Sequence, residues 1–416
     1  MQTKPRVLFV NRSYWPDAEA TGQLLSDLCE SLTDRFDVSV LCGQPNRNPT
    51  QAAYERTRIQ LHRGVTIHRL AHTQFNKRRG MGRMANLVSF TLAVRRWLKT
   101  APPYDVIVSE TDPFLLPLVV SPHAEKCGAV YVAYLQDVYP DIAVRLGRAK
   151  DGRVTRWLRS RLSEAYHQAA TVVVLSPNMK SELAAWGIEP SKIKIVPNWV
   201  DCGDVIPIKQ ANAFRRSNGW DDSFVVMHSG NMGLSQKLSA LIETVQHPLF
   251  PPHAKLALVG GGADEQGLKQ LAAKSTRRED IQFFPYQPRE HLSESLSAAD
   301  VHVISVDPRI GGTMMPSKLY GILASGTPVI VIADSNSDVA RVVTENRVGI
   351  VSGTHQPAHI AAAIAAMTTL TSQQRAEMQD RARQLAQSEF DKPICVNRFA
   401  DILHQVLPQN RCRLSL

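Results

Sequence analysis

Residues 6–42, RVLFVNRSYWPDAEATGQLLSDLCESLTDRFDVSVLC, decide the fold. A short apolar run at 6–11 is followed by a helical pattern at 21–33 and by a second apolar run, DVSVLC, at 37–42. Near-continuous apolar runs separated by a helix are typical of parallel strands that are covered on both faces. The stretch therefore predicts a β-α-β unit, from which doubly wound sheets are built.

The same alternation continues through the chain. Further strands are predicted at 65–70, 105–110, 130–136, 171–176, 224–229, 255–260, 281–284, 301–306, 328–333 and 348–351. Further helices are predicted at 81–100, 113–127, 153–170, 177–187 and within 357–407. The interval 199–222 is rich in turn-forming residues and shows no clear strand, so we expect it to link two Rossmann-like halves. Ligands bind such sheets at the carboxyl ends of the strands, so functional loops from both halves should meet in a cleft.

Length and composition exclude several classes of protein. The 416 residues fit two domains of about 200 residues each. An apolar content of 44% and a charged content of 21% are ordinary for a globular protein. We expect neither secretion nor a membrane span, because the apolar runs are short and none resembles a signal region. The six cysteines form no Cys-x-x-Cys pair and the 13 histidines show no ligand spacing, which predicts reduced thiols and no bound metal.

The net charge of +10 is concentrated near the N-terminus. Residues 56–104 contain 11 Lys and Arg residues and no acidic residue. Such an excess indicates a polyanionic partner, either phospholipid or nucleic acid, or else a solvated basic face. Within it, the helix predicted at 81–100 carries an apolar stripe of Met84, Leu87, Val88, Thr91 and Leu98, beside Phe90, Val94 and Trp97 and flanked by Arg79, Arg83, Arg95, Arg96 and Lys99. We expect this helix to dock on an anionic membrane, the alternative being that its stripe packs on the N-terminal sheet.

Candidate binding residues follow the predicted strands. Glycine turns occur at Gly22, at Gly230-Asn231 and at Gly260-Gly261. They suit a nucleotide site, although a tight turn between a strand and a helix requires glycine in any case. Asp137 follows the strand at 130–136 and is a candidate for orienting or deprotonating a hydroxyl, the alternative being a helix cap.

The most informative stretch is GGTMMPSKLYGILASGTPVI at 311–330. A Gly-Gly loop precedes a helix with Pro316 near its first position and Ser317 and Lys318 in its first turn. Helix-start amides together with a cation can receive a leaving diphosphate. A lysine in the first turn opposes the helix dipole unless an anion is bound, which favours a binding role for Lys318 over a structural one. We expect its side chain to be exposed.

Several motifs resemble group 1 (family 4) glycosyltransferases of the GT-B fold. They are VPNWVD at 196–201, SGNMG at 229–233, AADV at 298–301 and PSKLYGILASGTPVI at 316–330. QDVYPD at 136–141 is similar to a motif of bacterial O-antigen and colanic-acid transferases. The resemblance implies an acceptor-binding domain of residues 1–200, joined by a last helix at 392–407, and a nucleotide-sugar-binding domain of residues 201–391.

The resemblance also implies an activity. A hexosyltransferase of this kind takes a sugar from a UDP- or GDP-sugar with retention of configuration and without a metal or other cofactor. The acceptor would be a lipid-linked sugar or oligosaccharide, such as a polyprenyl-diphosphate-linked sugar, used for O-antigen or exopolysaccharide at the cytoplasmic face of the membrane. No nucleic acid partner is expected. The expected catalytic residues are Asp137, Lys318 and Lys237, and the expected substrate- or donor-binding residues are Gly22, Gly230, Asn231, Gly260, Gly261, Arg309, Gly312, Thr313, Ser317 and Gly321.

The chain departs from the family's pattern at two places. The paired glutamates of the family align with Thr313 and Gly321, so other groups must hold the ribose hydroxyls. The Arg and Lys expected after Gly230 align with Asn231 and Gln236. The cation for the diphosphate must then come from Lys318, Lys237 or Arg309. A relaxed subfamily and an inactive copy are both consistent with these departures.

Other functions fit the sequence less well. A sugar-nucleotide epimerase of similar shape needs a carboxylate and histidine set that has no candidate here. A dehydrogenase needs G-x-G-x-x-G, but Gly260-Gly261-Gly262 is followed by Glu265 where that pattern has its last glycine. A non-catalytic binding protein rests on the basic segment alone, which has no repeated stacking pattern.

Overall fold

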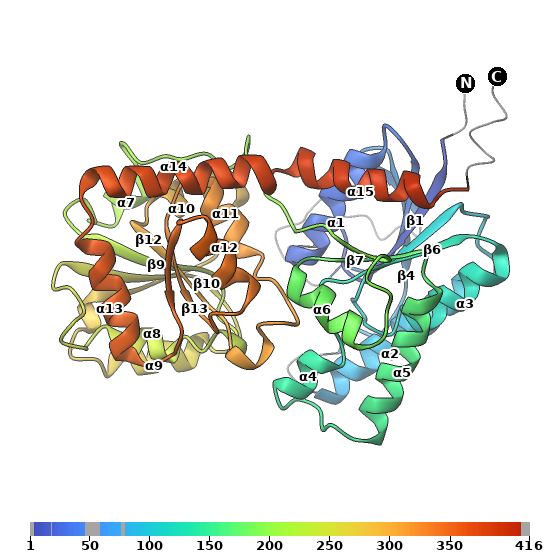
Figure 1. The fold of residues 1–416 in the computed structure, drawn as a ribbon, viewed down its shortest axis with the longest axis horizontal. Coiled ribbons are helices and arrows are strands. Elements are labelled where there is room, and N and C mark those ends of the chain that lie inside the picture. The colour runs from blue at the N-terminus through green and yellow to red at the C-terminus, as the bar shows by residue number, and fades with distance from the viewer. Residues whose placement is uncertain (1–3, 18, 46–58, 76–79, 409–416) are drawn as a thin grey trace. The chain divides into compact units, whose positions relative to one another are not determined.

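The computed structural model describes residues 4–17, 19–45, 59–75 and 80–408. The chain forms two compact units, Met1–Pro197 with Val396–Leu416 and Asn198–Cys395. Each unit is built on its own sheet with helices packed against it (Figure 1). The doubly wound fold predicted from the alternating pattern is confirmed in both units.

The sheet of the N-terminal unit has the strand order β3-β4-β2-β1-β5-β6-β7-β8 and is parallel apart from β3. Its strands are β1 (Arg6–Val10), β2 (Asp37–Gly43), β3 (Ile59–His62), β4 (Val65–Leu70), β5 (Val106–Ser109), β6 (Val130–Tyr134), β7 (Thr171–Val174) and β8 (Ile193–Ile195). Its helices are α1 (Ala20–Leu32), α2 (Gly80–Leu98), α3 (Pro117–Cys127), α4 (Asp141–Arg145), α5 (Arg153–Gln168), α6 (Pro177–Ala185) and most of α15 (Lys392–Val406). The central strands are buried on both faces, which explains their continuous apolar sequences.

The last helix, α15, packs on this first unit. The ring of Phe399 lies 6.1 Å from that of Phe9 in β1 and 5.0 Å from that of Tyr134 in β6, and all three side chains are fully buried. Further along, His404 lies 4.7 Å from Phe36. The C-terminal end of the described chain is therefore part of the core formed by the first 197 residues.

The sheet of the C-terminal unit is parallel, in the order β11-β10-β9-β12-β13-β14. Its strands are β9 (Phe224–Asn231), β10 (Ala254–Gly261), β11 (Ile281–Phe284), β12 (Val301–Ser305), β13 (Val329–Ile332) and β14 (Gly349–Ser352). Its helices are α7 (Ala213–Ser217), α8 (Ser239–Thr244), α9 (Glu265–Ala273), α10 (Leu292–Ser297), α11 (Lys318–Ala324), α12 (Asp338–Glu345), α13 (Pro357–Thr368) and α14 (Ser372–Glu389). The strand order reverses between β9 and β12 here, and between β1 and β5 in the other unit, and such reversals are where ligands bind.

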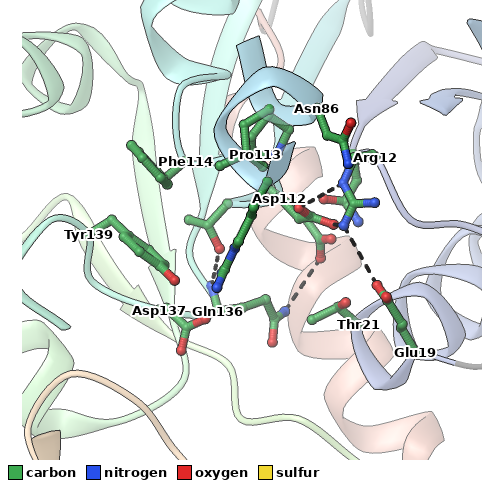
Figure 2. Close-up of a pocket in the computed structure, with 15 residues that line it drawn as sticks. Arg12, Glu19, Thr21, Asn86, Asp112, Pro113, Phe114, Gln136, Asp137 and Tyr139 are labelled. Carbon is green, nitrogen blue, oxygen red and sulfur yellow. Dashed lines mark hydrogen bonds and ion pairs between the residues drawn. The ribbon is translucent and has the colours of Figure 1, made fainter. Parts of the chain in front are cut away.

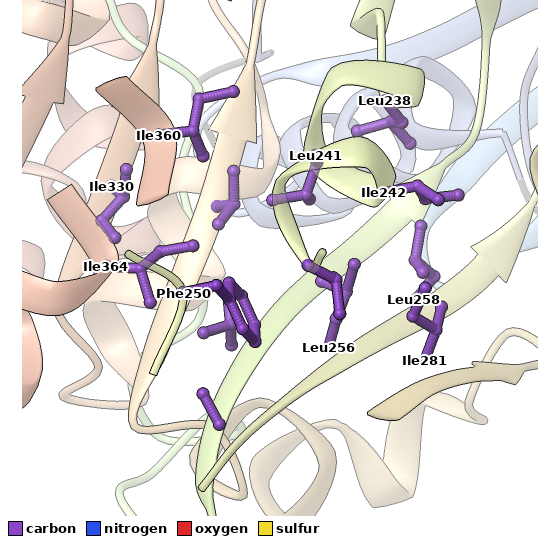
Figure 3. Close-up of a cluster of buried hydrophobic side chains, with 14 of the residues drawn as sticks. Leu238, Leu241, Ile242, Phe250, Leu256, Leu258, Ile281, Ile330, Ile360 and Ile364 are labelled. Carbon is purple, nitrogen blue, oxygen red and sulfur yellow. The ribbon is translucent and has the colours of Figure 1, made fainter. Parts of the chain in front are cut away.

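A buried apolar layer holds the second sheet in place. Helices α8 and α13 pack together against it, and Figure 3 shows their side chains facing those of the strands. The residues in this layer include Leu241, Ile242, Leu256, Leu258, Ile330, Ile360 and Ile364, none more than 1% exposed. The loops at the carboxyl ends of β9, β10 and β12 therefore rise from a rigid base.

The predicted secondary structure differs from the observed one at several places, of which β3, α4 and the start of α3 are instructive. Strand β3 was not predicted; it pairs antiparallel with β4 through a tight turn at Arg63-Gly64, where both φ angles are positive. It is only four residues long, and its apolar residues Ile59 and Leu61 are exposed while Gln60 and His62 are partly buried, so the run is too short and too mixed to predict a buried strand. Helix α4 was also missed, because it is only five residues long. The helix predicted from 113 begins at Pro117, where proline occupies its first turn.

The expected linker at 199–222 is part of the second unit rather than a free connection. Trp220 is fully buried, and its indole N–H donates to Gln282 Oε1 over 2.8 Å. Lys209 Nζ donates to Thr327 Oγ1, also over 2.8 Å. The turn-forming residues of this segment allow it to wrap around the unit, and the boundary between the units lies at Pro197-Asn198.

The apolar stripe expected at 81–100 lies on helix α2, where some of its residues are buried and others are exposed. Leu87, Phe90, Thr91, Val94 and Leu98 are buried in the first unit, as the packing alternative predicted. Met84 and Val88 are exposed, and so are their neighbours on that side, Met81 and Leu92. Arg79 lies outside the described residues. In the part of the chain that the structure describes, no helix is long and apolar enough to span a bilayer.

Candidate functional site

A pocket of ≈ 340 Å³ lies at the carboxyl edge of the first sheet, where the strand order reverses (Figure 2). The loops after β1, β5 and β6 form it together with the starts of α1 and α2. Its lining residues are Asn11, Arg12, Glu19, Thr21, Arg83, Asn86, Leu87, Glu110, Thr111, Asp112, Pro113, Phe114, Gln136, Asp137 and Tyr139. Its size and mixed polar and apolar lining are those of a site for a small organic molecule.

An ion-pair network fixes one side of this pocket. The Arg12 guanidinium donates to both carboxylate oxygens of Asp112, over 3.1 Å and 2.8 Å, and lies 3.8 Å from Glu19. The backbone N–H of Arg12 also donates to the carbonyl of Asp112 over 2.6 Å. The loops after β1 and β5 are therefore clamped together, and Arg12 serves to shape the pocket.

The opposite side carries Asp137 and an aromatic pair. The rings of Phe114 and Tyr139 are stacked with centroids 4.6 Å apart, and Figure 2 shows them across the pocket from Glu19 and Thr21. Burial, with the negative charge of Asp112, raises the pKa of Asp137 to about 6. The capping alternative for Asp137 is wrong, because α4 begins at Asp141 with Pro140 as its N-cap. A carboxylate with such a pKa can accept a proton from a bound hydroxyl near neutral pH.

The second candidate group lies at the carboxyl edge of the other sheet. Strands β9 and β10 pair Gly230 with Gly260 and Asn231 with Gly261. Gly260 has φ 130°, and a Cβ there would lie 2.1 Å from the carbonyl oxygen of Gly230. Only glycine permits this approach, so the glycines predicted from the sequence are brought together in one place, and the backbone there is left open.

Lys318 lies beside these glycines. Its Nζ is 3.1 Å from His228 Nε2, and a Cβ on Gly230 would be 3.6 Å from the same Nζ. Burial lowers the pKa of Lys318 to about 7, and burial with the nearby Lys318 charge also keeps the pKa of His228 well below its usual range. The exposed position expected for Lys318 is wrong, because α11 lays its first residue over the end of β9. Among its described contacts, Lys318 has no carboxylate that would neutralise its charge, so the charged amine is available to an anion bound here.

The other two candidate cations share one buried carboxylate. Arg309 donates to Asp307 from Nε over 2.9 Å and from Nη2 over 2.6 Å, and Lys237 Nζ lies 3.5 Å away from the same group. The Arg309 hydrogen bond lowers the pKa of Asp307 to about 2. The backbone N–H of Asp307 donates to Ser235 over 3.0 Å, so this cluster adjoins the loop after β9. Lys237 and Arg309 are thus held in place, with their charge partly balanced.

The remaining candidates have mainly packing contacts. Thr313 is fully buried and donates to the carbonyl of Ile310 over 2.9 Å, whereas Gly321 packs on Leu296 inside α11. Gly22 is buried against Ser13 and Tyr14. Gly312 is partly buried and Ser317 is exposed. The structure therefore places no polar side chain at the two positions where the resembled family has glutamates, other than the buried hydroxyl of Thr313.

Sequence reasoning missed several residues of these two groups. Asn11 and Glu110 were included in strands predicted at 6–11 and 105–110, although each lies one residue beyond the observed strand. Asp307 and His228 were not singled out: His228 contacts Lys318, 90 positions away, and Asp307 is held both by its neighbour Arg309 and by the distant Lys237. Among the described residues, no cluster of three or more His, Cys, Asp or Glu side chains could hold a metal, and the five described cysteines are unbridged.

Comparison with known proteins identifies the family. Residues 20–199 match the family described as "Glycosyl transferase 4-like domain", and residues 210–385 match "Glycosyl transferases group 1". The probable glycosyltransferase WbjE of Pseudomonas aeruginosa is 23% identical over 309 residues, 74% of this chain and 76% of that protein. The putative colanic acid biosynthesis glycosyl transferase WcaI of Escherichia coli (strain K12) is 24% identical over 353 residues, 81% of this chain and 85% of that protein.

Solved structures share the whole architecture. Sucrose-phosphate synthase from Thermosynechococcus elongatus superposes with a TM-score of 0.76 at 15% identity, covering 97% of this chain and 99% of that one. HepE of Anabaena in complex with UDP gives a TM-score of 0.74 at 17% identity, covering 96% and 100%. At such identities the likeness concerns the fold, and the two family matches together cover most of the sequence. The chain therefore belongs to the group 1 (family 4) glycosyltransferases and has their GT-B fold.

Proposed function

We propose that this glycosyltransferase moves a hexose from a UDP- or GDP-sugar, with retention of configuration and without a metal, to a lipid-linked sugar in the synthesis of a cell-surface polysaccharide. The C-terminal unit would bind the donor and the N-terminal unit the acceptor. The UDP complex of HepE supports the choice of donor, and the names of WbjE and WcaI support the class of reaction. The transfer would take place at the cytoplasmic face of a membrane.

The observation that carries this proposal is the position of Lys318. A partly buried amine beside the open backbone of Gly230 suits the diphosphate of a donor, because an anion there restores the charged form of the lysine. Lys237 and Arg309 lie on the same sheet edge and would add positive charge, although Asp307 already balances part of it. Asn231, which is exposed, and Gly261, which is partly buried, are the proposed neighbours of the nucleotide.

The chemistry follows from where charge develops. As the bond from the sugar to the β-phosphate breaks, negative charge builds on the departing diphosphate, and a fixed cation stabilises that charge more than it stabilises the ground state. The acceptor hydroxyl attacks the anomeric carbon on the face from which the diphosphate departs, and its proton passes to the departing phosphate or to Asp137. Asp137 has a pKa that suits this role near neutral pH.

A transfer assay separates this proposal from the alternatives. The protein would be incubated with radiolabelled UDP- and GDP-sugars in the presence of bacterial membranes, and the products extracted into organic solvent. The proposal predicts label in a lipid-soluble product and release of the nucleoside diphosphate. An epimerase would instead convert the nucleotide sugar without acceptor, and a binding protein would leave every substrate unchanged.

We expect chelation with EDTA to leave the rate of transfer largely intact. The charge of the departing diphosphate would be met by Lys318 and by backbone N–H groups, which do the work that a metal ion does in other transferases. The measurement is the initial rate with and without a chelator. A collapse of the rate that magnesium or manganese restores would show that this part of the proposal is wrong.

Helix α2 connects the pocket with a membrane in this proposal. Arg83, Asn86 and Leu87 line the pocket, whereas Met81, Met84, Val88 and Leu92 of the same helix are exposed. Arg95, Arg96 and Lys99 at its end are also exposed. Apolar side chains flanked by basic ones suit the interface of an anionic bilayer, where each basic residue contributes about 1 kcal/mol. A lipid-linked acceptor could then enter the pocket while its lipid stays in the bilayer.

Liposome binding tests the role of α2. The protein should co-sediment with anionic phosphatidylglycerol vesicles at low salt, bind less as salt screens the charges, and not bind phosphatidylcholine vesicles. The double variant Met84→Glu/Val88→Glu should lose this binding, whereas Leu249→Glu, which changes an exposed leucine of the other unit, should keep it. Equal binding to neutral vesicles, or no binding to anionic ones, would favour a soluble acceptor, and undiminished binding by the double variant would remove α2 from the docking surface.

A further inference from the structure

Two polar atoms in the N-terminal pocket are buried and have no hydrogen-bond partner. They are Oδ1 of Asn11 and Oε2 of Glu110, and both residues line the pocket. Buried polar atoms are paired in the great majority of native structures, because leaving one unpaired forfeits its interaction with water. Two such atoms in one pocket therefore indicate a ligand that supplies the missing partners.

The strands place these two residues side by side. Val10 and Ser109, the last residues of β1 and β5, are paired in register, so Asn11 and Glu110 are the next residues along neighbouring strands. The backbone N–H of Glu110 continues the ladder by donating to Val10 over 3.1 Å. Both side chains thus start from the same point of the sheet edge, at the reversal of strand order.

The hydrogen bonds already made define which atoms remain available. The Asn11 amide nitrogen donates to the carbonyl of Ser13 over 2.8 Å, which fixes the amide orientation and leaves Oδ1 as a free acceptor. The Gln136 amide nitrogen lies 3.4 Å from Glu110 Oε1 and points its donor there, which leaves Oε2 free. A protonated Glu110 would then carry its O–H at Oε2 and could donate it into the pocket.

The surroundings keep the Glu110 carboxyl neutral. Burial raises the pKa of Glu110 to about 8, and the negative charge of Asp112 acts in the same direction. The thiol of Cys29 in α1 is also buried near Glu110. Besides Glu110 and Asp112, the titratable or charged side chains that line the pocket include Arg12, Glu19, Arg83 and Asp137. Arg12 is engaged by Asp112 and Glu19, and Glu110 forms no ion pair among the described residues. At neutral pH the pair thus offers one donor and one acceptor, with no net charge.

We propose that Glu110 and Asn11 bind a hydroxyl of the acceptor sugar, which accepts a hydrogen bond from the Glu110 carboxyl and donates one to the Asn11 amide oxygen. A hydroxyl is both donor and acceptor, whereas an ammonium group offers donors only and would bind only if Glu110 gave up its proton, which burial disfavours at neutral pH. The pair therefore selects a neutral sugar over an amino sugar, and the stacked rings of Phe114 and Tyr139 give the same pocket an apolar wall. This inference rests on the proposed role of the N-terminal unit as the acceptor site.

Sugar binding to matched variants tests the inference. Binding of methyl α-D-glucopyranoside and of its 2-amino analogue would be followed by ligand-observed NMR with the wild type, Glu110→Gln and Glu110→Leu. We expect the neutral glycoside to bind better than the amino one. Glu110→Gln keeps a donor and should bind like the wild type, whereas Glu110→Leu should bind about tenfold or more weakly. Thermal unfolding confirms that each variant is folded.

The dependence on pH gives a second readout. Binding of the neutral glycoside to the wild type should weaken between pH 7 and pH 9, as Glu110 loses the proton that it donates, and Glu110→Gln should show no such change. Unchanged binding by Glu110→Leu, preference for the amino glycoside, or no detectable binding of the neutral one would overturn the inference. Calorimetric titration with UDP is run in parallel to separate the two hypotheses. If the proposed function is wrong, UDP does not bind; if only the inference is wrong, UDP binds and the glycosides do not behave as expected.

Discussion

Replacement of Lys318 by alanine is expected to lower the rate of sugar transfer by tens to thousands of fold, around the loss of about a hundred- to a thousandfold that follows removal of one electrostatic stabiliser of a transition state. The reason is the position of its Nζ beside Gly230, where the described contacts include no carboxylate that neutralises it. The fold should survive, because a buried amine with a lowered pKa pays a desolvation cost that the substitution removes. Initial rates with a radiolabelled nucleotide sugar measure the effect, and Lys318→Met provides a variant of similar volume.

A second partly buried lysine of the same unit serves as the control. Lys209 also has a lowered pKa, about 8, but its Nζ donates to Thr327 Oγ1 and to the carbonyls of Ser297 and Ala299. Lys209→Met should therefore lower the melting temperature and leave the rate of the folded enzyme nearly unchanged. If both lysine variants lost stability and kept their rates, Lys318 would be a structural residue and not part of the donor site.

The pKa of Lys318 adds a pH dependence to this result. Its amine is mainly charged below about pH 7 and mainly neutral above it, so affinity for UDP should fall as the pH rises from 7 to 9. The fall can reach about tenfold per pH unit if the charged form alone binds. Lys318→Arg keeps its charge over this range, so its affinity should not show the fall.

Asp137→Asn is expected to give the second large effect, a fall in transfer rate of about a hundredfold or more, with little change in donor affinity. The substitution keeps the shape of the side chain but removes the group that can take the proton of the acceptor hydroxyl. In the wild type the rate should fall as the pH drops below about 6, where Asp137 becomes protonated, and the variant should lack this limb. Steady-state kinetics over a range of pH, with UDP binding by calorimetry, gives both quantities.

Asp141 supplies a matched control four residues along the chain. Its carboxylate is bound by Arg159 and is absent from the lining of the pocket, so Asp141→Asn should cost stability and not rate. Loss of UDP binding in Asp137→Asn would mean that Asp137 belongs to the donor side. A rate close to that of the wild type would remove it from the reaction.

The sequence was sufficient for the fold because the central strands are buried on both faces. Continuous apolar runs such as those of β1, β5 and β9, when helical patterns separate them, are typical of parallel strands. The predicted strands accordingly match the observed ones within a few residues. The edge strand β3 was missed because it is only four residues long and its two apolar residues, Ile59 and Leu61, lie on the exposed side and not in the core. The segment 199–222 was predicted to be a linker because it is rich in turn-forming residues. Such residues are equally suited to a segment that wraps around a domain, which is what the structure shows.

The candidate site was only partly predictable. Gly230, Gly260 and Lys318 could be singled out, because glycines after strands suit a nucleotide site and a lysine in the first turn of a helix opposes the helix dipole. The burial of Lys318 against His228 could not, since it depends on a contact between residues 90 positions apart. Asn11 and Glu110 were not predicted as site residues, because two strands were predicted one residue too long at their carboxyl ends and so included them.

The most direct test of the central claim is a crystal structure of the full chain with UDP. The claim is that the diphosphate of the donor binds in the C-terminal unit, beside Gly230 and Lys318. We predict a phosphate oxygen within about 3 Å of Lys318 Nζ, with the nucleoside along the carboxyl edge of β9 and β10. UDP bound instead in the pocket of Arg12 and Asp137, or with its phosphates away from Lys318, would contradict the claim.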